Sequence, residues 1–233
     1  MSGFQLARMG LAAAAFALVA GAAVAGETLD VTIGDVDAAG RFADSAAFCP
    51  PEGAPETNVS PEVRWSEGPE GTGSYAVLMT DADVPADFSL INKPGVTIAA
   101  DAPRVTIHHW VLVDIPAYQS MLARGVESER RVVGGKPIGQ TDHGVRGANV
   151  FTAFFAGNAE MAGTYGGYDG PCPPTNDLRV HRYRIEVFAL DVPTLGLSGA
   201  FTGADAEAAM KGHVLAHGSA TATYSLNPAV AGQ

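Results

Sequence analysis

Titratable side chains stand at fixed spacings inside otherwise apolar segments of the chain, where an unpaired polar group is costly. Asp81 and Asp83 are two residues apart and follow an apolar run. Residues two apart on an extended chain share a face, so both carboxylates are expected on one side of a strand. His181 and Tyr183 share a side by the same spacing. Together the two pairs supply two acids, an imidazole and a phenol for a common site.

The adjacent histidines His108 and His109 lie in a third apolar segment. Neighbours on a strand point in opposite directions, so at most one of them can face a common site. A buried carboxylate beside an imidazole is costly unless each group satisfies the other, which makes such groups informative at the ends of apolar strands. Two histidines and a carboxylate can hold a metal or perform acid-base catalysis, so a metal-dependent or Asp/His hydrolase stays an alternative.

Familiar catalytic motifs do not occur in the sequence. It contains no Gly-x-Ser-x-Gly elbow, no phosphate-cradling loop with a lysine and no dinucleotide fingerprint. An enzyme is therefore not required, no cofactor is implied, and no catalytic residue is assigned. His213 and His217 are four residues apart on a predicted helix, but no acidic residue stands between them as in a zinc protease helix. We interpret them as helix-end residues and assign no metal ligands.

The elements that must position these groups are mainly strands. Apolar runs and one sharply alternating segment predict strands at 74–81, 105–115, 182–189 and 221–226. A helical pattern occurs once, at 204–216. Scattered glycine and proline favour short strands joined by long loops. We therefore expect an all-β sandwich of two mainly antiparallel sheets with one or two short helices, the main one near the C-terminus.

Two loops stand out by their length, at 50–61 and at 134–177, and the second is rich in glycine, asparagine and aspartate. Long ordered loops on a sandwich usually carry function, although they can also be tolerated insertions. We expect these two loops to contribute to the site.

The N-terminal segment has the form of a secretory signal, because Arg8 precedes an apolar run that leads to an Ala-x-Ala site ending at Ala25. Cleavage there would leave one domain, residues 26–233, in the periplasm or outside the cell. No stable membrane anchor is expected. The formal net charge of the full chain is -11, which argues against nucleic acid or an anionic membrane surface as the main partner.

The chain has two cysteines, Cys49 and Cys172. In an oxidising compartment they can form a disulfide, but two separate buried thiols fit the sequence equally well. The sequence leaves both arrangements open.

The order of the motifs resembles the phosphatidylethanolamine-binding protein family, in its bacterial Raf kinase inhibitor-like branch. That family shows an Asp-x-Asp-x-Pro segment, a His-Trp or His-His segment, and a Gly-x-x-Pro-Pro loop that leads into His-Arg-Tyr. The stretches from Cys49 to Trp65 and from Gly212 to Ala216 also match. The three main motifs stand in this sequence as Asp81-Ala82-Asp83-Val84-Pro85, His108-His109-Trp110, and Gly170-Pro171-Cys172-Pro173-Pro174 followed by His181-Arg182-Tyr183.

The resemblance implies a pocket for a small anion. Its walls would be Asp81, Asp83, His109, His181 and Tyr183, with a rim formed by Gly170, Pro171, Cys172, Pro173 and Pro174. A protonated imidazole, a phenol hydroxyl and loop amides can donate to anionic oxygens. The carboxylates are expected to orient the histidines, to raise their pKa, or to share a proton with the ligand.

The chain departs from the family pattern at Ala82, at Val84 and in the connection from Thr175 to Val180, which affects the rim and hence the ligand size. The resemblance implies an exported, non-enzymatic binding or regulatory protein for a phosphate-like or phospholipid head-group-like ligand. An inhibitor module of an exported hydrolase, with a protein partner in the cell envelope, is the alternative from the same family. A homodimer is a further option that relatives suggest.

Overall fold

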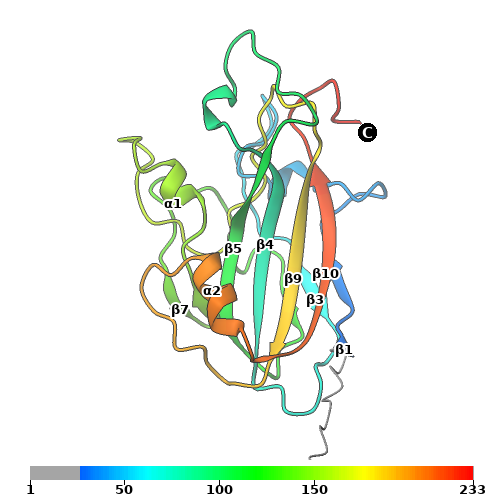
Figure 1. Cartoon of the computed structure of the whole chain (residues 1–233), viewed down its shortest axis with the longest axis vertical. Coiled ribbons are helices and arrows are strands. Elements are labelled where there is room, and N and C mark those ends of the chain that lie inside the picture. Colours follow the sequence, from blue (N-terminus) through cyan, green and yellow to red (C-terminus); the bar gives the residue numbers. More distant parts are fainter. Residues whose placement is uncertain (1–26, 233) are drawn as a thin grey trace, which may run out of the picture.

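Two β-sheets packed face to face form the framework of the protein, and the longest strands run side by side through the larger sheet (Figure 1). The computed structural model describes residues 27–232, so the expected export signal at 1–25 lies outside the described part. Named strands in the described part pair antiparallel except β1 with β10, which is parallel. This architecture confirms the predicted sandwich of two mainly antiparallel sheets.

The larger sheet has seven strands and the smaller one has three. In spatial order the larger sheet consists of β1 (Glu27–Thr28), β10 (Val214–Tyr224), β9 (His181–Leu190), β4 (Ser74–Pro85), β5 (Arg104–Pro116), β8 (Gly144–Arg146) and β7 (Gly139–Thr141). The smaller sheet consists of β2 (Val31–Ile33), β3 (Val63–Trp65) and β6 (Met121–Leu122).

Alternation along β4 explains why this strand is apolar on both faces. Tyr75, Val77 and Met79 belong to the core between the two sheets, whereas Ala76 and Leu78 belong to a second core on the outer face. The strands predicted at 74–81, 105–115 and 182–189 are therefore confirmed as the central strands of the larger sheet. The predicted strand at 221–226 is the last part of the longer β10.

Helices are short and few in the described chain. They are α1 (Phe151–Phe154), α2 (Gly203–Met210) and the 3-10 turns η1 (Asp44–Ala46) and η2 (Phe88–Leu90). The long loop at 134–177 contains α1 together with β7 and β8. Thr202 caps α2 through a reciprocal pair with Asp205, in which each side chain accepts from the other residue's backbone amide.

The predicted helix at 204–216 is wrong beyond Met210. Lys211 leaves the helical conformation, and Gly212 takes a left-handed φ of 86°, which only glycine adopts easily. Val214 then begins β10, so His217 lies in a strand and not at a helix end. The apolar spacing at 214–216 fits a helix and a strand alike, and pairing with β9 decides the outcome.

Two irregularities in the pairing of β4 with β5 decide where the polar residues point. Met79 lies opposite Trp110 and Thr80 lies opposite His108, so His109 is an extra residue on β5. A second shift falls between Asp81 and Val84. Such bulges re-aim side chains and are common beside functional sites.

Cys49 and Cys172 form a disulfide, with their Cα atoms 4.6 Å apart. The bond connects the start of the loop at 50–61 to the loop that precedes β9, across a sequence separation of 123 residues. No helix within residues 27–232 has the length and apolar character needed to cross a bilayer.

Replacing both cysteines by alanine is expected to lower the free energy of unfolding by about 4 to 5 kcal/mol, because the bond closes a long loop in the unfolded chain. Urea denaturation of the wild type and of the Cys49→Ala/Cys172→Ala variant measures the difference. A loss below about 1 kcal/mol would show that the bond contributes little to stability.

Candidate functional site

His109 is a buried histidine of which one ring nitrogen makes a hydrogen bond and the other makes none to the described residues. Its Nδ1 donates to the backbone carbonyl of Asp169 at 3.0 Å. Its Nε2 has no hydrogen-bond partner among the described residues. The ring packs edge-on against Phe151 and Tyr183. Burial lowers the pKa of His109 below 6.5, although the negative charge of Asp81 acts in the opposite direction.

His181 lies between two carboxylates at the start of β9. Its Nδ1 donates to Asp81 at 2.7 Å and its Nε2 donates to Asp177 at 3.2 Å. Burial alone would lower the pKa of His181, but the hydrogen bonds to Asp177 and Asp81 outweigh it and raise the pKa to about 9. Carboxylates therefore raise the pKa of His181 as expected, whereas at His109 burial outweighs the effect of Asp81.

Asp177 completes this chain of charges through Arg104. Burial would raise the pKa of Asp177, but hydrogen bonds from His181 and Arg104 lower it to about 2. The Arg104 guanidinium contacts both oxygens of the carboxylate, at 2.5 and 3.1 Å. The buried side chains therefore form a chain of alternating negative and positive charges, in the order Asp81, His181, Asp177 and Arg104.

Three of the five predicted pocket residues line one cavity of about 150 Å³, namely Asp81, His109 and His181. Most of its wall is apolar and comes from β4, β5, the two residues after η2, α1 with the residue after it, and the loop that leads into β9. The remaining lining residues are Val84, Ile91, Asn92, Ile107, Phe151, Phe154, Phe155, Cys172 and Pro174.

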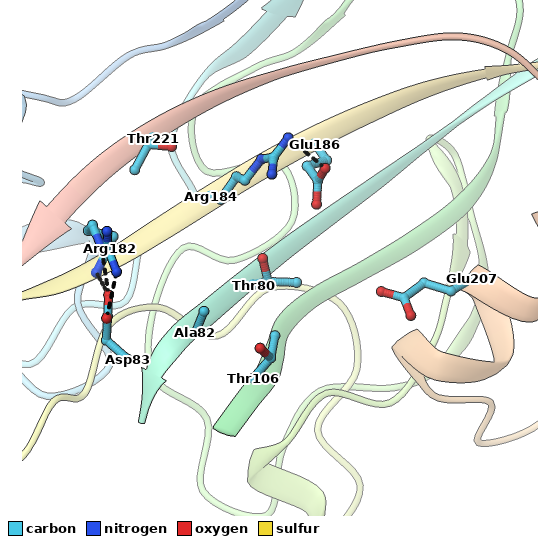
Figure 2. A pocket seen from close by; sticks show the side chains of 9 residues that line it. All are labelled: Thr80, Ala82, Asp83, Thr106, Arg182, Arg184, Glu186, Glu207 and Thr221. Carbon is cyan, nitrogen blue, oxygen red and sulfur yellow. Dashed lines mark hydrogen bonds and ion pairs between the residues drawn. The ribbon is translucent and has the colours of Figure 1, made fainter. Parts of the chain in front are cut away.

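Asp83 lies outside this cavity. Its carboxylate accepts from Arg182 at 2.8 and 2.9 Å and from Arg179 at 3.0 Å, beside a depression on the outer face of the larger sheet (Figure 2). The shift in strand pairing between Asp81 and Val84 breaks the two-residue alternation on which the shared-face prediction depended. Burial would raise the pKa of Asp83, but these arginines lower it.

Tyr183 supports the cavity without lining it. The side chain is fully buried, and its ring centroid lies 5.3 Å from that of His109 and 6.4 Å from that of His181. Burial raises the pKa of its hydroxyl, which has no hydrogen-bond partner among the described residues. The Tyr183 ring therefore packs against both imidazoles in this structure.

The predicted rim is only partly at the cavity. Cys172 and Pro174 line it, whereas Gly170, Pro171 and Pro173 do not. Gly170 is required for another reason, because a Cβ atom there would lie 1.9 Å from the carbonyl oxygen of Ala46. That close approach fixes the path of the rim against the loop before β3.

Sequence reasoning missed several residues of the site. Asp177 accepts from His181 and is itself held by Arg104. Asn92 lies in the wall, and its Oδ1 accepts from Thr175 at 2.8 Å. The aromatic wall of α1 could have been found from the spacing of Phe151, Phe154 and Phe155. Residues three and four apart share one face of a helix. Within residues 27–232, no three His, Cys, Asp or Glu side chains are arranged to hold a metal ion.

The buried charge on His181 makes stability depend on pH. Its pKa is about 9 in the folded chain and near 6.5 in the unfolded chain, which corresponds to roughly 3 kcal/mol of stabilisation. This contribution is complete below pH ~6.5 and is lost as the pH rises through about 9. The His181→Asn variant should therefore lose most stability relative to the wild type near neutral pH and progressively less at alkaline pH. Denaturant unfolding of both proteins from pH 6 to pH 10 measures this difference.

NMR titration of the ring provides the control, since the imidazole of His181 should stay protonated through neutral pH. A stability difference that does not change between pH 6 and pH 10, or a neutral His181 at pH 7, would contradict the buried ion chain.

The sequence of this chain is similar to those of known proteins over most of its length. The profile of the phosphatidylethanolamine-binding protein family matches residues 25–225. The UPF0098 protein of Aquifex aeolicus is 32% identical over 159 residues, which cover 68% of this chain and 70% of that protein. The UPF0098 protein YbcL of Escherichia coli is 31% identical over 147 residues, 63% of this chain and 61% of its own length.

A solved structure agrees with the fold. The crystal structure of E. coli YbcL, described as a new member of the mammalian PEBP family, superposes with a TM-score of 0.59 and 24% identity. The superposition covers 84% of this chain and 98% of that one. Since the family profile spans most of the sequence, this chain belongs to the phosphatidylethanolamine-binding protein family.

Proposed function

We propose that this chain is an exported, non-enzymatic binding protein that holds a small phosphate-like or head-group-like anion in the cavity beside His109. The observation that carries the proposal is the buried Nε2 of His109, which has no partner among the described residues although the ring lines a cavity. A buried polar atom without a partner costs free energy unless a ligand or water supplies one. A ligand with polar oxygens would supply that partner.

The tautomer of His109 restricts which ligand fits. Because the carbonyl of Asp169 can only accept, Nδ1 must carry the proton, and neutral His109 presents a lone pair at Nε2. That lone pair accepts from a ligand O–H, or it takes up a proton and then donates to an anionic oxygen. Either way, the anion and one proton are bound together.

The charges around the cavity favour an anion despite the acidic chain. Four buried carboxylates are paired with five cationic groups. The carboxylates are Asp81, Asp83, Asp169 and Asp177, and the cationic groups are Arg104, Lys136, Arg179, His181 and Arg182. The nearby acids are therefore neutralised by the protein itself, and they leave little net repulsion toward a bound anion.

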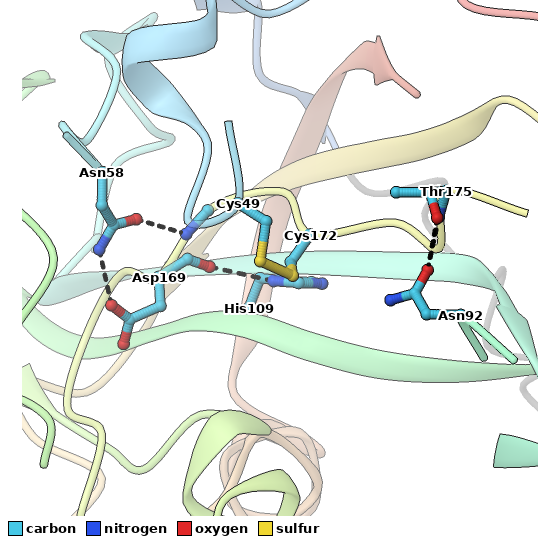
Figure 3. The surroundings of a disulfide bond; sticks show 8 residues. Cys49, Asn58, Asn92, His109, Asp169, Cys172 and Thr175 are labelled. Carbon is cyan, nitrogen blue, oxygen red and sulfur yellow. Dashed lines mark hydrogen bonds between the residues drawn. A yellow bond between two sulfur atoms is a disulfide. The ribbon is translucent and has the colours of Figure 1, made fainter. Parts of the chain in front are cut away.

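The volume of the cavity limits the size of the bound group. A cavity of about 150 Å³ has room for a few water-sized groups at ~30 Å³ each, which suits a head group and not a whole lipid. Asn92 adds a donor, because its Oδ1 accepts from Thr175 and its amino group points the other way (Figure 3).

Affinity for inorganic phosphate should fall as the pH rises from 5 to 8, by up to about tenfold per pH unit where one proton is taken up on binding. Burial lowers the pKa of His109 and so disfavours its protonated form in the free protein, whereas a bound anion stabilises that form. Isothermal titration with phosphate across this pH range, in two buffers of different ionisation enthalpy, measures both the affinity and the proton uptake.

The His109→Phe variant keeps a ring against Phe151 and Tyr183 but removes both nitrogens, so it should lose phosphate binding and its pH dependence. The matched control is His108→Phe. His108 does not line this cavity and pairs instead with Glu207 of α2 at 3.0 Å, so that variant should bind as the wild type does. Equal affinities for all three proteins, or binding that does not change with pH, would refute the proposal.

Export is supported by the signal-like N-terminal sequence and by the disulfide, because such bonds persist in oxidising compartments. Protein isolated from the periplasmic or extracellular fraction of its source should begin at Gly26. Intact mass spectrometry tests this, and a full-length cytoplasmic product with free thiols would contradict it.

A further inference from the structure

The loop that leads into the rim is held by a buried asparagine on a different segment. Asn58 donates through Nδ2 to the Asp169 carboxylate at 2.7 Å, and its Oδ1 accepts from the backbone amide of Gly170 at 2.8 Å (Figure 3). One side-chain amide thus fixes two successive residues. Its own backbone is in the left-handed region, with a φ of 81°, which few residues other than glycine adopt.

Asp169 gathers further donors from two other segments. Its carboxylate accepts from Lys136 at 2.5 Å and from Asn149 at 2.7 Å, and all these side chains are buried. A buried carboxylate with this many charge-assisted bonds has a strongly fixed position. Asn149 also accepts from the amide of Phe151 through its Oδ1. The cluster therefore fixes the start of α1, whose aromatic side chains line the cavity.

The same residue that this cluster immobilises also determines the state of His109. The backbone carbonyl of Asp169 accepts the Nδ1 proton of His109. If that carbonyl moved away, the proton could occupy either ring nitrogen, and Nε2 would no longer be fixed as the acceptor. The side-chain contacts of Asp169 thus control the imidazole without touching the cavity themselves.

We propose that Asn58 and Asp169 are positioning residues of the ligand pocket, which hold the backbone at 169–170 so that His109 keeps its proton on Nδ1 and presents Nε2 to the ligand. The consequence for affinity depends on the proposed anion-binding function, whereas the consequence for the His109 tautomer does not. The left-handed backbone of Asn58 fits this role, since the conformation is retained together with three side-chain hydrogen bonds, to Asp169, Gly170 and Ser128.

The test uses Asn58→Gly, because glycine accepts the left-handed backbone and removes only the side-chain amide. The matched control is Asp114→Gly. Asp114 is also left-handed, with a φ of 55°, and its side chain also bonds to another segment, accepting from Thr194 and Leu195 at 2.8 Å each. Neither Asp114 nor its partners line the cavity.

Long-range proton–nitrogen NMR of the ligand-free proteins reports which nitrogen of His109 is protonated. The wild type and Asp114→Gly should show the single Nδ1–H form, and Asn58→Gly should show a mixture of both tautomers. Inorganic phosphate should bind about tenfold more weakly to Asn58→Gly, as expected for the loss of one well-placed hydrogen bond. An unchanged tautomer in folded Asn58→Gly would overturn the proposal.

A second variant covers the case in which Asn58→Gly does not fold. Asp169→Asn with Lys136→Met removes both buried charges together and so leaves neither one unpaired. The same loss of the single tautomer is expected. If both variants unfold while Asp114→Gly folds, the cluster serves the fold and not the pocket, which also counts against the proposal.

The two proposals can fail separately. A wild type with a single Nδ1–H tautomer that Asn58→Gly disturbs, but with no phosphate binding at any pH, would refute the anion-binding function and keep the positioning role. If the wild type binds phosphate and Asn58→Gly shows the same tautomer and the same affinity, the anion-binding function stands and the positioning role is refuted.

Discussion

A protonated imidazole buried between two carboxylates is the interaction on which the rest of the site depends. His181 at the start of β9 donates to Asp81 near the end of β4 and to Asp177 in the preceding loop. Taking these charges out of water is favourable only when every donor and acceptor is satisfied, and here the two ring nitrogens of His181 are both engaged. Arg104 on β5 neutralises the second carboxylate, so three neighbouring strands are tied together at one end of the sheet.

This arrangement separates the structural polar groups from the one that is available to a ligand. Asp81 is committed through both oxygens, one to His181 and the other to the amide of Asp83. His109 sits above the same cluster but shares none of its hydrogen bonds, since its Nδ1 binds a loop carbonyl. The ion chain is therefore nearly neutral, and beside it the buried Nε2 of His109 and the Tyr183 hydroxyl have no hydrogen-bond partner among residues 27–232.

Much of the fold follows from patterns in the sequence. Apolar runs at 74–81 and 105–115 and sharp alternation at 182–189 predicted the central strands, because these strands are buried on one or both faces. The element that follows α2 could not be predicted in the same way, since residues 214–216 form a short apolar run that is compatible with either a helix or a strand. Only their pairing with β9 makes them a strand, and that pairing is a tertiary contact.

In the candidate site, too, some residues could be predicted from local sequence patterns and others depend on tertiary contacts. Spacing and motif order predicted that Asp81, His109 and His181 share one cavity, because strand order and side-chain alternation determine which face they lie on. The prediction for Asp83 was wrong because one irregular step in the strand pairing turns a side chain to the other face of the sheet, and a bulge leaves no local sequence signal. Asn58 and Lys136 could not be found from spacing at all, since they meet Asp169 from distant loops.

If the cavity binds an anion as proposed, the protonation state of His109 would make it selective in a way that a permanently charged site would not be. A permanently protonated imidazole would attract any small anion, whereas a neutral one in an apolar wall repels an anion that arrives without a proton. Under the proposed anion-binding function, the cavity would favour oxyanions whose own pKa lies near neutrality, as that of a phosphate monoester does at about 6, because they would carry the proton into the cavity. Three features present the Nε2 of His109 to the cavity as an acceptor. The bulge turns the side chain inward, the carbonyl of Asp169 holds the proton on Nδ1, and the ion chain neutralises the acidic neighbours.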